Sequence, residues 1–462
     1  MTQRFETKVL IIGAGMAGLC AAVTALENGA TVMVLEKGNR YGGSMALSNG
    51  LIWTFAQAAD ALLHVPEGDA ASQELLVENF PADLAWLSGL GVQLEPEIRF
   101  LQYGRGQRSA PSQMMDVLLD RITALGGTVL PSTAMHELTT QNGKVDGAIA
   151  FRNGEMLEIR AQAVILATGG FQGNPEMVAR YITPNADSLY LRSNPWSTGD
   201  GILAAQKMGA AMTPCLHTFY GHAMSAPPTR FNRLQFQEMS HKYGQLAVAL
   251  NLDGHRFADE SAGTGEELLN AHIAQQPKAT AVYLFDAQIA EHCLEGTTLA
   301  RVVVERTKNA GGPVIQEDSL EKLAAAMTAW GLPSAQVLET LSAYNEAARA
   351  RHAEGIVPAR RKHLHPLASA PFTAVLVRAS ITFTGGGLYS DLSMRVQRRS
   401  SSVSTMRLVT ADASELSIAA IPGLFAAGCD VGGFNAEGYV GGLAQALVTG
   451  RVAGLGASES CK

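Results

Sequence analysis

Apolar and polar positions near the start of the chain follow a pattern that changes twice within 36 residues. Residues 9–12 form a short apolar run rich in β-branched side chains, which is typical of a buried parallel strand. Apolar residues then recur at helical spacing over residues 16–28, and residues 31–35 form a second apolar run. The pattern predicts a strand, a helix and a second strand.

Glycines stand at the turn between the first strand and the helix. Gly13, Gly15 and Gly18 give the spacing GxGxxG, which permits a tight turn, a close backbone approach to a pyrophosphate and close packing of the helix on the strand. The N–H groups at the start of the helix would point at the phosphates. Glu36 ends the second strand, where its carboxylate is placed for ribose hydroxyls. The segment predicts a dinucleotide site, and the alternative is a glycine-rich turn in an ordinary strand–helix–strand unit.

The stretch after the acid, "EKGNRYGGSMALSNGLIW", favours FAD over NAD. Gly42 and Gly43 give a second close backbone approach, and small residues follow them. The stretch resembles the segment that passes along the isoalloxazine ring in the FAD-dependent succinate dehydrogenase and fumarate reductase flavoprotein superfamily. Residues 163–174 and 421–433 resemble the second and third FAD-contact motifs of that superfamily, and the third brings an acidic or polar residue to the ribityl chain.

The resemblance implies FAD as the cofactor, bound non-covalently, because residues 44–49 contain no histidine where covalent members attach the flavin. The residues that it implies for cofactor binding are Gly13, Gly15, Ala17, Gly18, Glu36, Lys37, Gly42, Gly43, Ser44, Ser48, Asn49, Gly50, Ala167, Thr168, Gly169, Asp200, Gly428, Asp430, Gly442, Leu443 and Ala444.

The same motifs set the expected architecture. We expect an α/β fold with a discontinuous Rossmann-like FAD-binding domain, residues 1–224 and 371–462, and an inserted α+β capping domain, residues 225–370. The insert contains the alternating stretch "TAVYLFDAQ" and a helical stretch over residues 320–351. Residues 397–417 are polar and predict an exposed loop or hairpin. No second GxGxxG follows a strand, so a separate NAD(P)H domain is not expected.

Tyr439, in "FNAEGYVGGLAQALVTGR", stands before a glycine pair that opens the last helix. In the superfamily the N-terminus of this helix faces the flavin, and the N–H groups and dipole there stabilise negative charge on the reduced ring. In a similar segment of fumarate reductases, an arginine that clamps a substrate carboxylate stands at the position of Tyr439. A tyrosine resembles the 3-ketosteroid dehydrogenase branch, in which a tyrosine hydroxyl and a glycine N–H polarise the substrate ketone. "SNGLIW", which ends in Trp53, also resembles that branch.

The acid–base residues of neither branch carry over completely. Thr264 stands where the ketosteroid enzymes have a basic tyrosine, and Thr382 and Phe383 stand where fumarate reductases have a histidine before a glycine turn. The resemblance leaves Tyr103, His222 and Tyr220 as further catalytic candidates beside Tyr439, and it places Tyr439, Gly442 and Trp53 at the substrate. We expect Arg256 and Glu260 to form a structural ion pair under the capping domain.

The favoured function is an FAD-dependent oxidoreductase that acts on a CH–CH bond next to a carbonyl, with a hydrophobic cyclic ketone such as a 3-ketosteroid as the substrate. The alternative is an enzyme of the fumarate reductase or tricarballylate dehydrogenase type, which acts on a small polycarboxylate. Arg105, Arg108 or the arginines near residue 230 would then clamp the substrate. A flavin-binding protein with a structural or sensory role is a third reading.

The composition of the chain limits the kinds of ligand and partner that we expect. The 462 residues are 47% hydrophobic and 17% charged, with a formal net charge of −7, which indicates a well-buried globular protein and argues against nucleic acid as a ligand. The five cysteines are scattered, so we expect no metal site, disulfide framework, haem or iron–sulfur cluster. Electrons must then pass to or from an external donor or acceptor. The sequence shows no secretory signal and no transmembrane stretch, which predicts a cytoplasmic protein.

Overall fold

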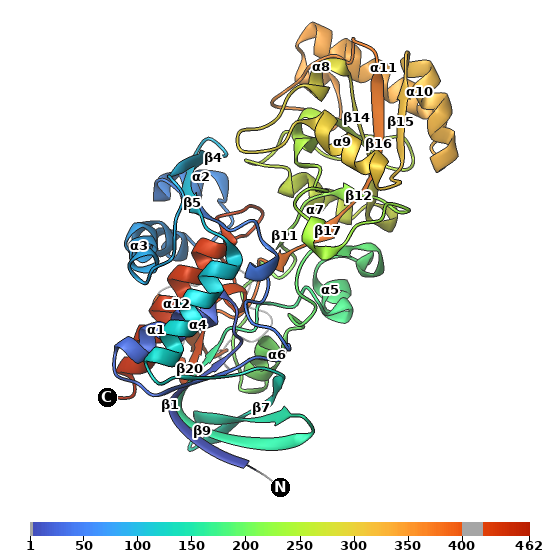
Figure 1. Cartoon of the computed structure of the whole chain (residues 1–462). Helices are drawn as coiled ribbons and strands as arrows, with labels where there is room; N and C mark the ends of the chain where they lie inside the picture. Colours follow the sequence, from blue (N-terminus) through green and yellow to red (C-terminus); the bar gives the residue numbers. More distant parts are fainter. Residues whose placement is uncertain (1–2, 400–418) are drawn as a thin grey trace, which may run out of the picture.

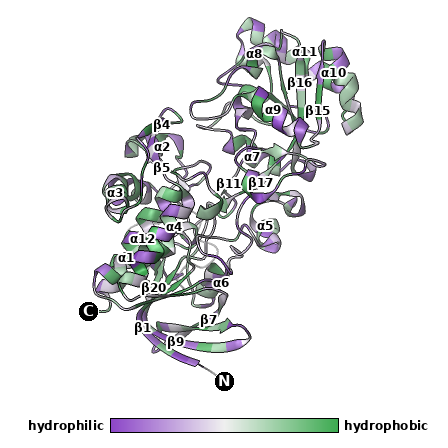
Figure 2. Cartoon of the chain, viewed as in Figure 1, coloured by the Kyte–Doolittle hydropathy of each residue, from purple (hydrophilic) through white to green (hydrophobic). Residues whose placement is uncertain are grey.

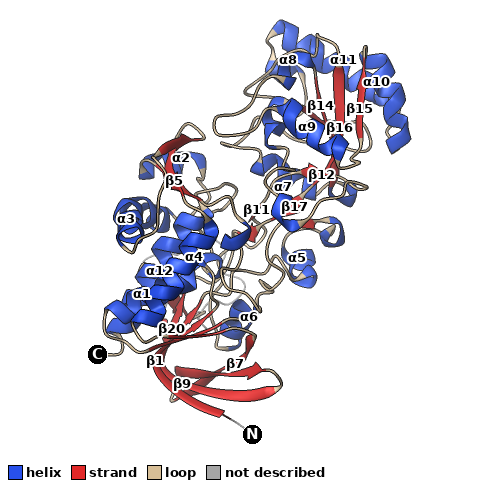
Figure 3. Ribbon diagram, viewed as in Figure 1, coloured by secondary structure: helices blue, strands red, loops and turns tan. Residues whose placement is uncertain are grey.

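The computed structural model describes residues 3–399 and 419–462, which form two lobes joined by several short segments (Figure 1). Residues 400–417 of the expected polar loop lie outside the described residues. The larger lobe holds both chain termini and an eight-stranded sheet, and the smaller lobe holds a five-stranded sheet (Figure 3).

The large sheet is built around β1 (Gln3–Ile12), whose last four residues are fully or almost fully buried. The order β19-β20-β9-β1-β2-β6 makes β1 a central strand, which explains its continuous apolar run. The hydrophilic colour of β1 near the N-terminus in Figure 2 marks the part that extends beyond this core. The other strands are β2 (Val32–Leu35), β6 (Thr128–Leu130), β7 (Thr133–Gln141), β8 (Lys144–Arg152), β9 (Glu155–Leu166), β19 (Arg395–Gln397) and β20 (Ala420–Ala426).

Helices α1 (Met16–Glu27), α4 (Pro111–Ala124) and α12 (Gly442–Glu459) lie together against this sheet (Figure 1). Helix α12 approaches α1 closely because Gly450 and Gly454 have no side chains. A Cβ added at Gly450 would lie 2.4 Å from the Ala17 carbonyl oxygen, and one at Gly454 would lie 2.5 Å from the Ala21 carbonyl oxygen. The C-terminal helix α12 is therefore packed closely on α1, the helix that follows the first glycine motif.

A three-stranded antiparallel sheet covers the large lobe near the N-terminus of α12. Its strands are β3 (Leu51–Phe55), β4 (Ile98–Phe100) and β5 (Gly104–Arg108), and helices α2 (Ala58–His64) and α3 (Ala70–Gly89) lie in the same insertion. This sheet carries Trp53 and Phe100, whose ring centroids are 4.9 Å apart.

The smaller lobe has an antiparallel sheet with its own core. Strand β14 (Thr280–Phe285), the stretch "TAVYLF", is buried at all six positions and pairs with β13 (Val248–Leu250) and β16 (Phe372–Arg378). Strands β12 (Met224–Ser225) and β15 (Val314–Glu317) also pair with β16. The expected helical stretch over residues 320–351 contains α10 (Leu320–Ala326) and α11 (Ser334–Ala350). The lobe also contains α7 (Glu267–Ala274), α8 (Ala287–Ala290) and α9 (Ala300–Asn309).

The expected α/β class with an α+β insert is confirmed. The second sheet includes β16, which lies after residue 370, so the sheet of the insert extends past the predicted end of the capping domain. The predicted pair of Arg256 and Glu260 is present: the guanidinium donates to the two carboxylate oxygens at 2.8 and 2.6 Å, and both side chains are buried.

Two short pairs of strands cross between the lobes. Strand β10 (Tyr190–Leu191) pairs with β17 (Ser380–Ile381), and β11 (Phe219–Tyr220) pairs with β18 (Phe383–Thr384). Helix α5 (Pro175–Tyr181) lies close to these strands, whereas α6 (Asp200–Lys207) lies beside β7 of the large sheet (Figure 1). None of the described helices is long and apolar enough to cross a membrane.

Candidate active site

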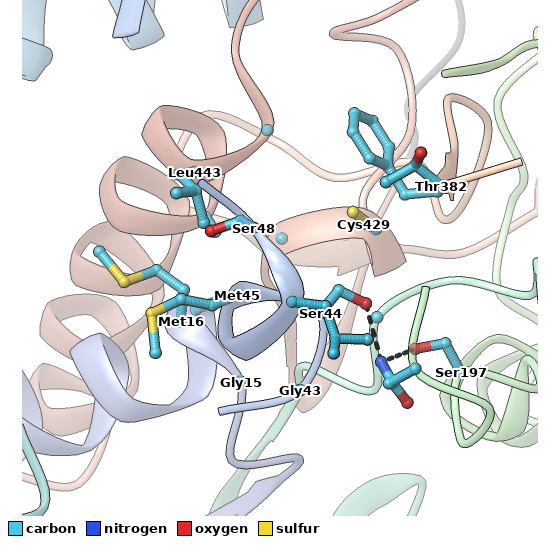
Figure 4. A pocket seen from close by; sticks show the side chains of 18 of the residues that line it. Gly15, Met16, Gly43, Ser44, Met45, Ser48, Ser197, Thr382, Cys429 and Leu443 are labelled. Carbon is cyan, nitrogen blue, oxygen red and sulfur yellow. Dashed lines mark hydrogen bonds between the residues drawn. The ribbon is translucent and has the colours of Figure 1, made fainter. Parts of the chain in front are cut away.

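An extended cavity runs from the first glycine motif to the crossing strands between the lobes. Its walls come from β1, β2, the turn after β9, the N-terminus of α12 and the residues around β10, β11 and β18. Figure 4 shows part of this cavity, with Met16 and Leu443 on one side and Thr382 on the other, and Cys429 lies between them on the short helix after β20. The three motifs that are far apart in the sequence therefore meet at one site.

The first glycine motif leaves open space at the start of α1. Gly13 has φ +113°, and a Cβ there would lie 2.2 Å from the Ala167 carbonyl oxygen, so this turn requires glycine. A Cβ at Gly15, in contrast, would meet no atom of the protein within 4 Å. Gly15 lines the cavity, and α1 begins at the next residue, Met16. This open space next to a helix N-terminus fits a pyrophosphate.

Glu36 stands at the end of β2, where its carboxylate is held by two backbone N–H groups. Ala14 donates to Oε2 at 2.9 Å and Gly38 donates to Oε1 at 2.7 Å. Burial raises the pKa of Glu36, and these two hydrogen bonds oppose the rise. The carboxylate lines the cavity beyond the glycine motif, at the place expected for a ribose contact.

The glycine–serine segment lies next to residues from the connecting region. Asn194 Nδ2 donates to Ser44 Oγ at 2.8 Å and to Ser197 Oγ at 3.0 Å, the two dashed contacts in Figure 4. Lys37 Nζ donates to Asp200 Oδ2 at 2.7 Å, and both side chains line the cavity. These bonds fix one wall of the cavity along its length.

The third motif places its acidic residue differently from the expectation. The Asp430 carboxylate is fully buried and accepts hydrogen bonds from the backbone N–H of Thr168 at 2.6 Å and of Gly170 at 2.9 Å. It thus holds the turn after β9 and does not line the cavity. The neighbouring Cys429 lines it instead, and burial raises the pKa of this thiol to about 12, so it stays protonated at neutral pH.

The cavity as a whole fits an FAD. Most of the residues expected to hold the cofactor line it: Gly13, Gly15, Ala17, Glu36, Lys37, Gly43, Ser44, Ser48, Asn49, Ala167, Thr168, Gly169, Asp200, Gly428, Gly442 and Leu443. The remaining five support the lining from behind: Gly18, Gly42, Gly50, Asp430 and Ala444. Gly18 shows how, since a Cβ there would lie 1.9 Å from the Gly13 carbonyl oxygen.

The far end of the cavity is lined by aromatic rings around Tyr439. The ring of Tyr220 stacks on that of Tyr439, with centroids 3.9 Å apart and an interplanar angle of 18°. Trp53 meets the Tyr439 ring edge-on at 5.2 Å, and Phe383 lies 5.1 Å from Tyr220. The two phenols, Trp53 and Phe383 all line the cavity.

Neighbouring residues leave no room for a side chain at the glycine pair after Tyr439. Gly441 has φ +101°, and a Cβ there would lie 1.8 Å from the Trp53 carbonyl oxygen. A Cβ at Gly442 would lie 2.9 Å from the Phe383 ring. The Gly442 N–H, at the start of α12, donates to the Tyr439 hydroxyl oxygen at 3.2 Å. The phenol proton of Tyr439 is thereby left for another acceptor.

Tyr220 begins a chain of hydrogen bonds that leads into the protein. Its hydroxyl lies 2.9 Å from His222 Nε2, and His222 Nδ1 lies 2.8 Å from Glu266 Oε2. Glu266 Oε1 accepts from the Tyr283 hydroxyl at 2.6 Å. His222 is 5% exposed and stands behind Tyr220, so it reaches the cavity only through that phenol.

Burial sets the protonation states in this chain. It lowers the pKa of His222 well below its usual value, and the nearby positive charges of Lys242 and Arg192 lower it further. Burial raises the pKa of Glu266 well above its usual value, although hydrogen bonds from Tyr283 and Ala223 oppose this. His222 is therefore neutral and Glu266 is protonated at neutral pH, so the pair holds two exchangeable protons and no net charge. Burial also raises the pKa of Tyr220 and of Tyr439, so both phenols are protonated.

Tyr103 is not brought into this group. It follows β4, where its ring centroid lies 4.1 Å from that of His64, and it does not line the cavity. Arg105 is exposed and donates to the Ala56 carbonyl oxygen at 3.3 Å, and Arg230 and Arg233 are also exposed. The arginines considered for a carboxylate clamp, Arg108 included, do not line the cavity either.

The family model of the FAD binding domain matches residues 8–442. The chain belongs to this FAD-binding family. The cofactor is therefore FAD, and the fold places it in the cavity that starts at the glycine motif of β1 and α1. The part of the chain that the structure describes has no group of three or more histidine, cysteine or acidic side chains that could hold a metal ion.

Proteins of both branches suggested by the sequence, the fumarate reductases and the ketosteroid dehydrogenases, are similar to this chain. A probable fumarate reductase of Shewanella frigidimarina is 28% identical, over 98% of this chain and 75% of that protein. A 3-oxosteroid 1-dehydrogenase of Mycolicibacterium smegmatis is 23% identical, over 97% of both chains. The open conformation of a flavocytochrome c3 fumarate reductase has a TM-score of 0.71 at 25% identity and covers 99% of this chain and 79% of that structure. The protein is thus an FAD-dependent oxidoreductase of the group that acts on carbon–carbon single or double bonds.

Two basic side chains that line the cavity, Arg192 and Lys242, were not predicted from the sequence. Arg192 follows β10 and Lys242 follows β12, and both line the cavity near Tyr220. The sequence signal available for Arg192 was a lone arginine in "LYLRSNPWSTGDG", next to residues of the FAD-contact region. Glu266 and Tyr283 were also missed, because only the fold brings them behind His222.

Proposed function

We propose that the protein transfers a hydride to or from the carbon β to a carbonyl group, with Tyr220 and Tyr439 as the catalytic side chains. The observation that carries the proposal is the pair of stacked, protonated phenols at the end of the FAD cavity, one of which leads to a buried histidine and carboxylic acid. Bound FAD supplies or accepts the hydride.

Tyr439 is proposed to polarise the carbonyl oxygen of the substrate. Its own oxygen accepts from the Gly442 N–H, so its O–H can donate into the cavity. A donor aimed at an oxygen that gains negative charge stabilises an enolate more than the ground-state carbonyl. Gly442 acts through the phenol in this scheme, whereas the sequence analysis expected it to contact the substrate directly.

Tyr220 is proposed to exchange the proton at the α-carbon. In the reductive direction its O–H gives the proton, and Tyr220 takes a replacement from His222 Nε2–H. His222 Nδ1 then takes the proton of Glu266 Oε2, which leaves the carboxylate stabilised by Tyr283 and the Ala223 N–H. In the oxidative direction the same protons move the opposite way. This sequence adds one hydride and one proton across the carbon–carbon bond.

The aromatic walls favour a substrate with an apolar body. Trp53, Phe100, Phe236 and Phe383 line the cavity near the two phenols, and they would exclude water and pack on a ring system. A hydrophobic cyclic ketone of the 3-ketosteroid kind fits these walls. The small-polycarboxylate alternative is less well supported in its original form, because Tyr439 replaces the arginine and none of its proposed clamping arginines lines the cavity.

A substrate screen with the reduced holoenzyme tests the proposal. Under anaerobic conditions, α,β-unsaturated ketones, aldehydes and carboxylates should each be mixed with enzyme whose FAD has been reduced by dithionite. We expect one class to restore the visible absorption of oxidised flavin and to yield the saturated product. Reoxidation by none of these compounds, with normal reoxidation by a quinone or by oxygen, would contradict the proposal.

The electron donor or acceptor is proposed to be a separate molecule, because the described residues form no second nucleotide-binding unit and the sequence has no haem-attachment motif. A cytoplasmic location stays part of the proposal.

A further inference from the structure

Arg192 has a buried guanidinium that forms no ion pair with a carboxylate among residues 3–399 and 419–462. Its side chain is only 4% exposed, yet it lines the substrate end of the cavity. Nη1 donates to Thr382 Oγ1 at 2.9 Å and Nε donates to Ser240 Oγ at 3.3 Å. Nη2 is buried and has no hydrogen-bond partner among the residues that the structure describes.

An arrangement of this kind is costly unless a ligand completes it. Arginine stays charged in proteins, and a buried charge is normally paired or fully hydrogen-bonded. The two neutral hydroxyls fix the plane of the guanidinium but do not neutralise it. Glu266, whose charge acts on Arg192, is already hydrogen-bonded to His222, Ala223 and Tyr283. Arg192 is thus held in place with donor capacity left over.

Lys242 adds a second cation to the same end of the cavity. Its Nζ donates to Gln237 Oε1 at 3.1 Å, and both residues line the cavity together with Arg192. No ion pair within 4.0 Å joins either cation to a carboxylate within residues 3–399 and 419–462. Two cations that face one cavity repel each other, and an anion between them removes this repulsion.

We propose that Arg192 and Lys242 form an anion subsite that binds a carboxylate group of the substrate. The inference deepens the proposed function and rests on it, since it names the charge of the molecule that the two phenols would act on. The substrate class is an unsaturated carbonyl compound that has an apolar ring body and also carries a carboxylate. Arg192 offers a planar donor edge that suits a carboxylate, and Lys242 offers a point charge.

The positions of the subsite and the phenols agree with this substrate. Thr382, which orients Arg192, donates its backbone N–H to the Tyr220 carbonyl oxygen at 2.7 Å, so the guanidinium is tied to the strand that carries one catalytic phenol. The aromatic walls stand around the same space. One ligand can therefore place its ring between the aromatic side chains and its carboxylate on the cations.

Lys242 gives the subsite a pH dependence. Burial lowers the pKa of Lys242 to about 7, and the charges of Arg192 and Arg108 lower it further, whereas Glu266 and Glu267 raise it. Lys242 is a cation below this value and is neutral above it. Binding of a carboxylate should therefore be tightest below pH 7 and should weaken as the pH rises to 8.5.

The test uses the oxidised holoenzyme and involves no turnover. Binding of trans-cinnamate and of its neutral isostere trans-cinnamamide is followed through the change in flavin absorption. We expect cinnamate to bind at least tenfold more tightly than the amide, which corresponds to about 1.4 kcal/mol. Arg192→Gln should reduce this preference to less than about threefold, and Arg192→Lys should retain part of it because the charge is kept. Lys242→Met should remove the weakening between pH 6 and pH 8.5.

The controls separate this inference from other roles of Arg192. Arg230→Gln, at an exposed arginine, should leave the preference unchanged, and each variant should keep its FAD. Equal binding of the two compounds by the parent enzyme, or no binding of either, overturns the inference. A variant Arg192→Gln that changes the flavin spectrum but keeps the preference also overturns it, because the guanidinium then serves the cofactor. A preference that depends on Arg192 upholds the subsite even if no compound reoxidises the reduced flavin, which would count only against the proposed reaction.

Discussion

At the scale of residues, the central feature is that two phenols share one end of the cavity and differ in their connections. Tyr439 is bonded to the backbone at the start of α12, whereas Tyr220 is bonded to His222. Neither phenol is ionised at neutral pH, because burial raises the pKa of both. In the proposed function, these different partners make Tyr439 a fixed donor and Tyr220 a proton carrier.

Replacement of Tyr220 by phenylalanine tests the second role. The ring would still stack on Tyr439, but no proton could pass from His222 to the substrate. General acid catalysis by one group typically contributes about a hundred- to ten-thousandfold in rate, so Tyr220→Phe should slow reoxidation of the reduced enzyme by its substrate to that extent. Stopped-flow spectroscopy of the flavin measures this rate.

His222→Gln and Tyr41→Phe complete this experiment. If the two residues form one relay, the double variant Tyr220→Phe with His222→Gln should be little slower than Tyr220→Phe alone. Tyr41→Phe removes a hydroxyl from a residue that does not line the cavity, and it should leave the rate unchanged. A Tyr220→Phe enzyme that reacts within about threefold of the parent would refute the proton-carrier role.

Sequence reasoning at this scale succeeded where the chemistry is local. The glycine motif and Glu36 lie within 24 residues of one another, and their spacing alone defines the dinucleotide site. Arg192 could not be found in this way, because its partners Ser240 and Thr382 are 48 and 190 residues away. The need for glycine at position 441 could not be predicted from the sequence either, because it arises from the Trp53 carbonyl group on strand β3.

At the scale of elements, the start of α1 and the start of α12 approach the cavity from the same layer of helices. Both starts supply backbone N–H groups, and the helix dipoles favour negative charge there. The glycines of α12 that face Ala17 and Ala21 keep these two helices close. The phosphates and the reduced ring of FAD are the negative groups that these two ends would stabilise.

Gly15→Val tests the first of these ends. The backbone of Gly15 has φ −80° and ψ −175°, which any residue adopts, and a Cβ would meet no protein atom within 4 Å. The variant should therefore fold normally but lose FAD, because the side chain would fill the space of the pyrophosphate. The ratio of flavin absorbance to protein absorbance after purification measures the loss, and circular dichroism checks the fold.

Gly89→Ala is a matched control for this prediction. Gly89 lies at the end of α3, where a Cβ would also meet no atom within 4 Å, but it does not line the cavity. This variant should keep its full flavin content. If Gly15→Val also retained its full flavin content, the phosphates would have to lie elsewhere.

The elements themselves were predicted unevenly. The buried strands β1 and β2 were recognisable, because strands buried on both faces have continuous apolar runs. The stretch of β14 was expected to alternate, but all six of its residues are buried. Strand β16 begins after residue 370, the predicted end of the capping domain, yet it pairs with a strand that lies before that residue. Its sequence, "FTAVLVR", resembles any buried strand, and only pairing with β14 shows that it belongs to the second sheet. The crossing strands at Tyr220 and Phe383 are two residues long and leave no periodic signal.

At the scale of the whole molecule, the cavity lies where the two lobes meet. The FAD-binding motifs come from the larger lobe, and Lys242, Glu266 and Tyr283 come from the smaller one. The predicted architecture, a discontinuous FAD-binding domain with an inserted α+β unit, is confirmed by the family match and by the two separate sheets. The exact division of the chain into domains stays a prediction.

The mode of attachment of FAD is a property of the intact holoenzyme. Residues 44–49 pass along the cavity without a histidine, and the Cys429 thiol stays protonated, so we expect no covalent bond to the flavin. Precipitation of the protein with acid should release yellow FAD into the supernatant. Flavin that stays with the protein pellet after washing would contradict this expectation.

The measurement that tests the account most directly is single-turnover flavin oxidation or reduction in Tyr439→Phe, compared with the parent enzyme. The phenylalanine ring keeps the contacts with Tyr220 and Trp53 but removes the hydroxyl held by the Gly442 N–H. A donor of this kind is worth about 2.7–4 kcal/mol, so the rate should fall roughly a hundred- to a thousandfold while FAD content and substrate affinity change little. A rate within about threefold of the parent, a difference of less than about 1 kcal/mol in the barrier, would contradict the role of Tyr439 on which the account rests.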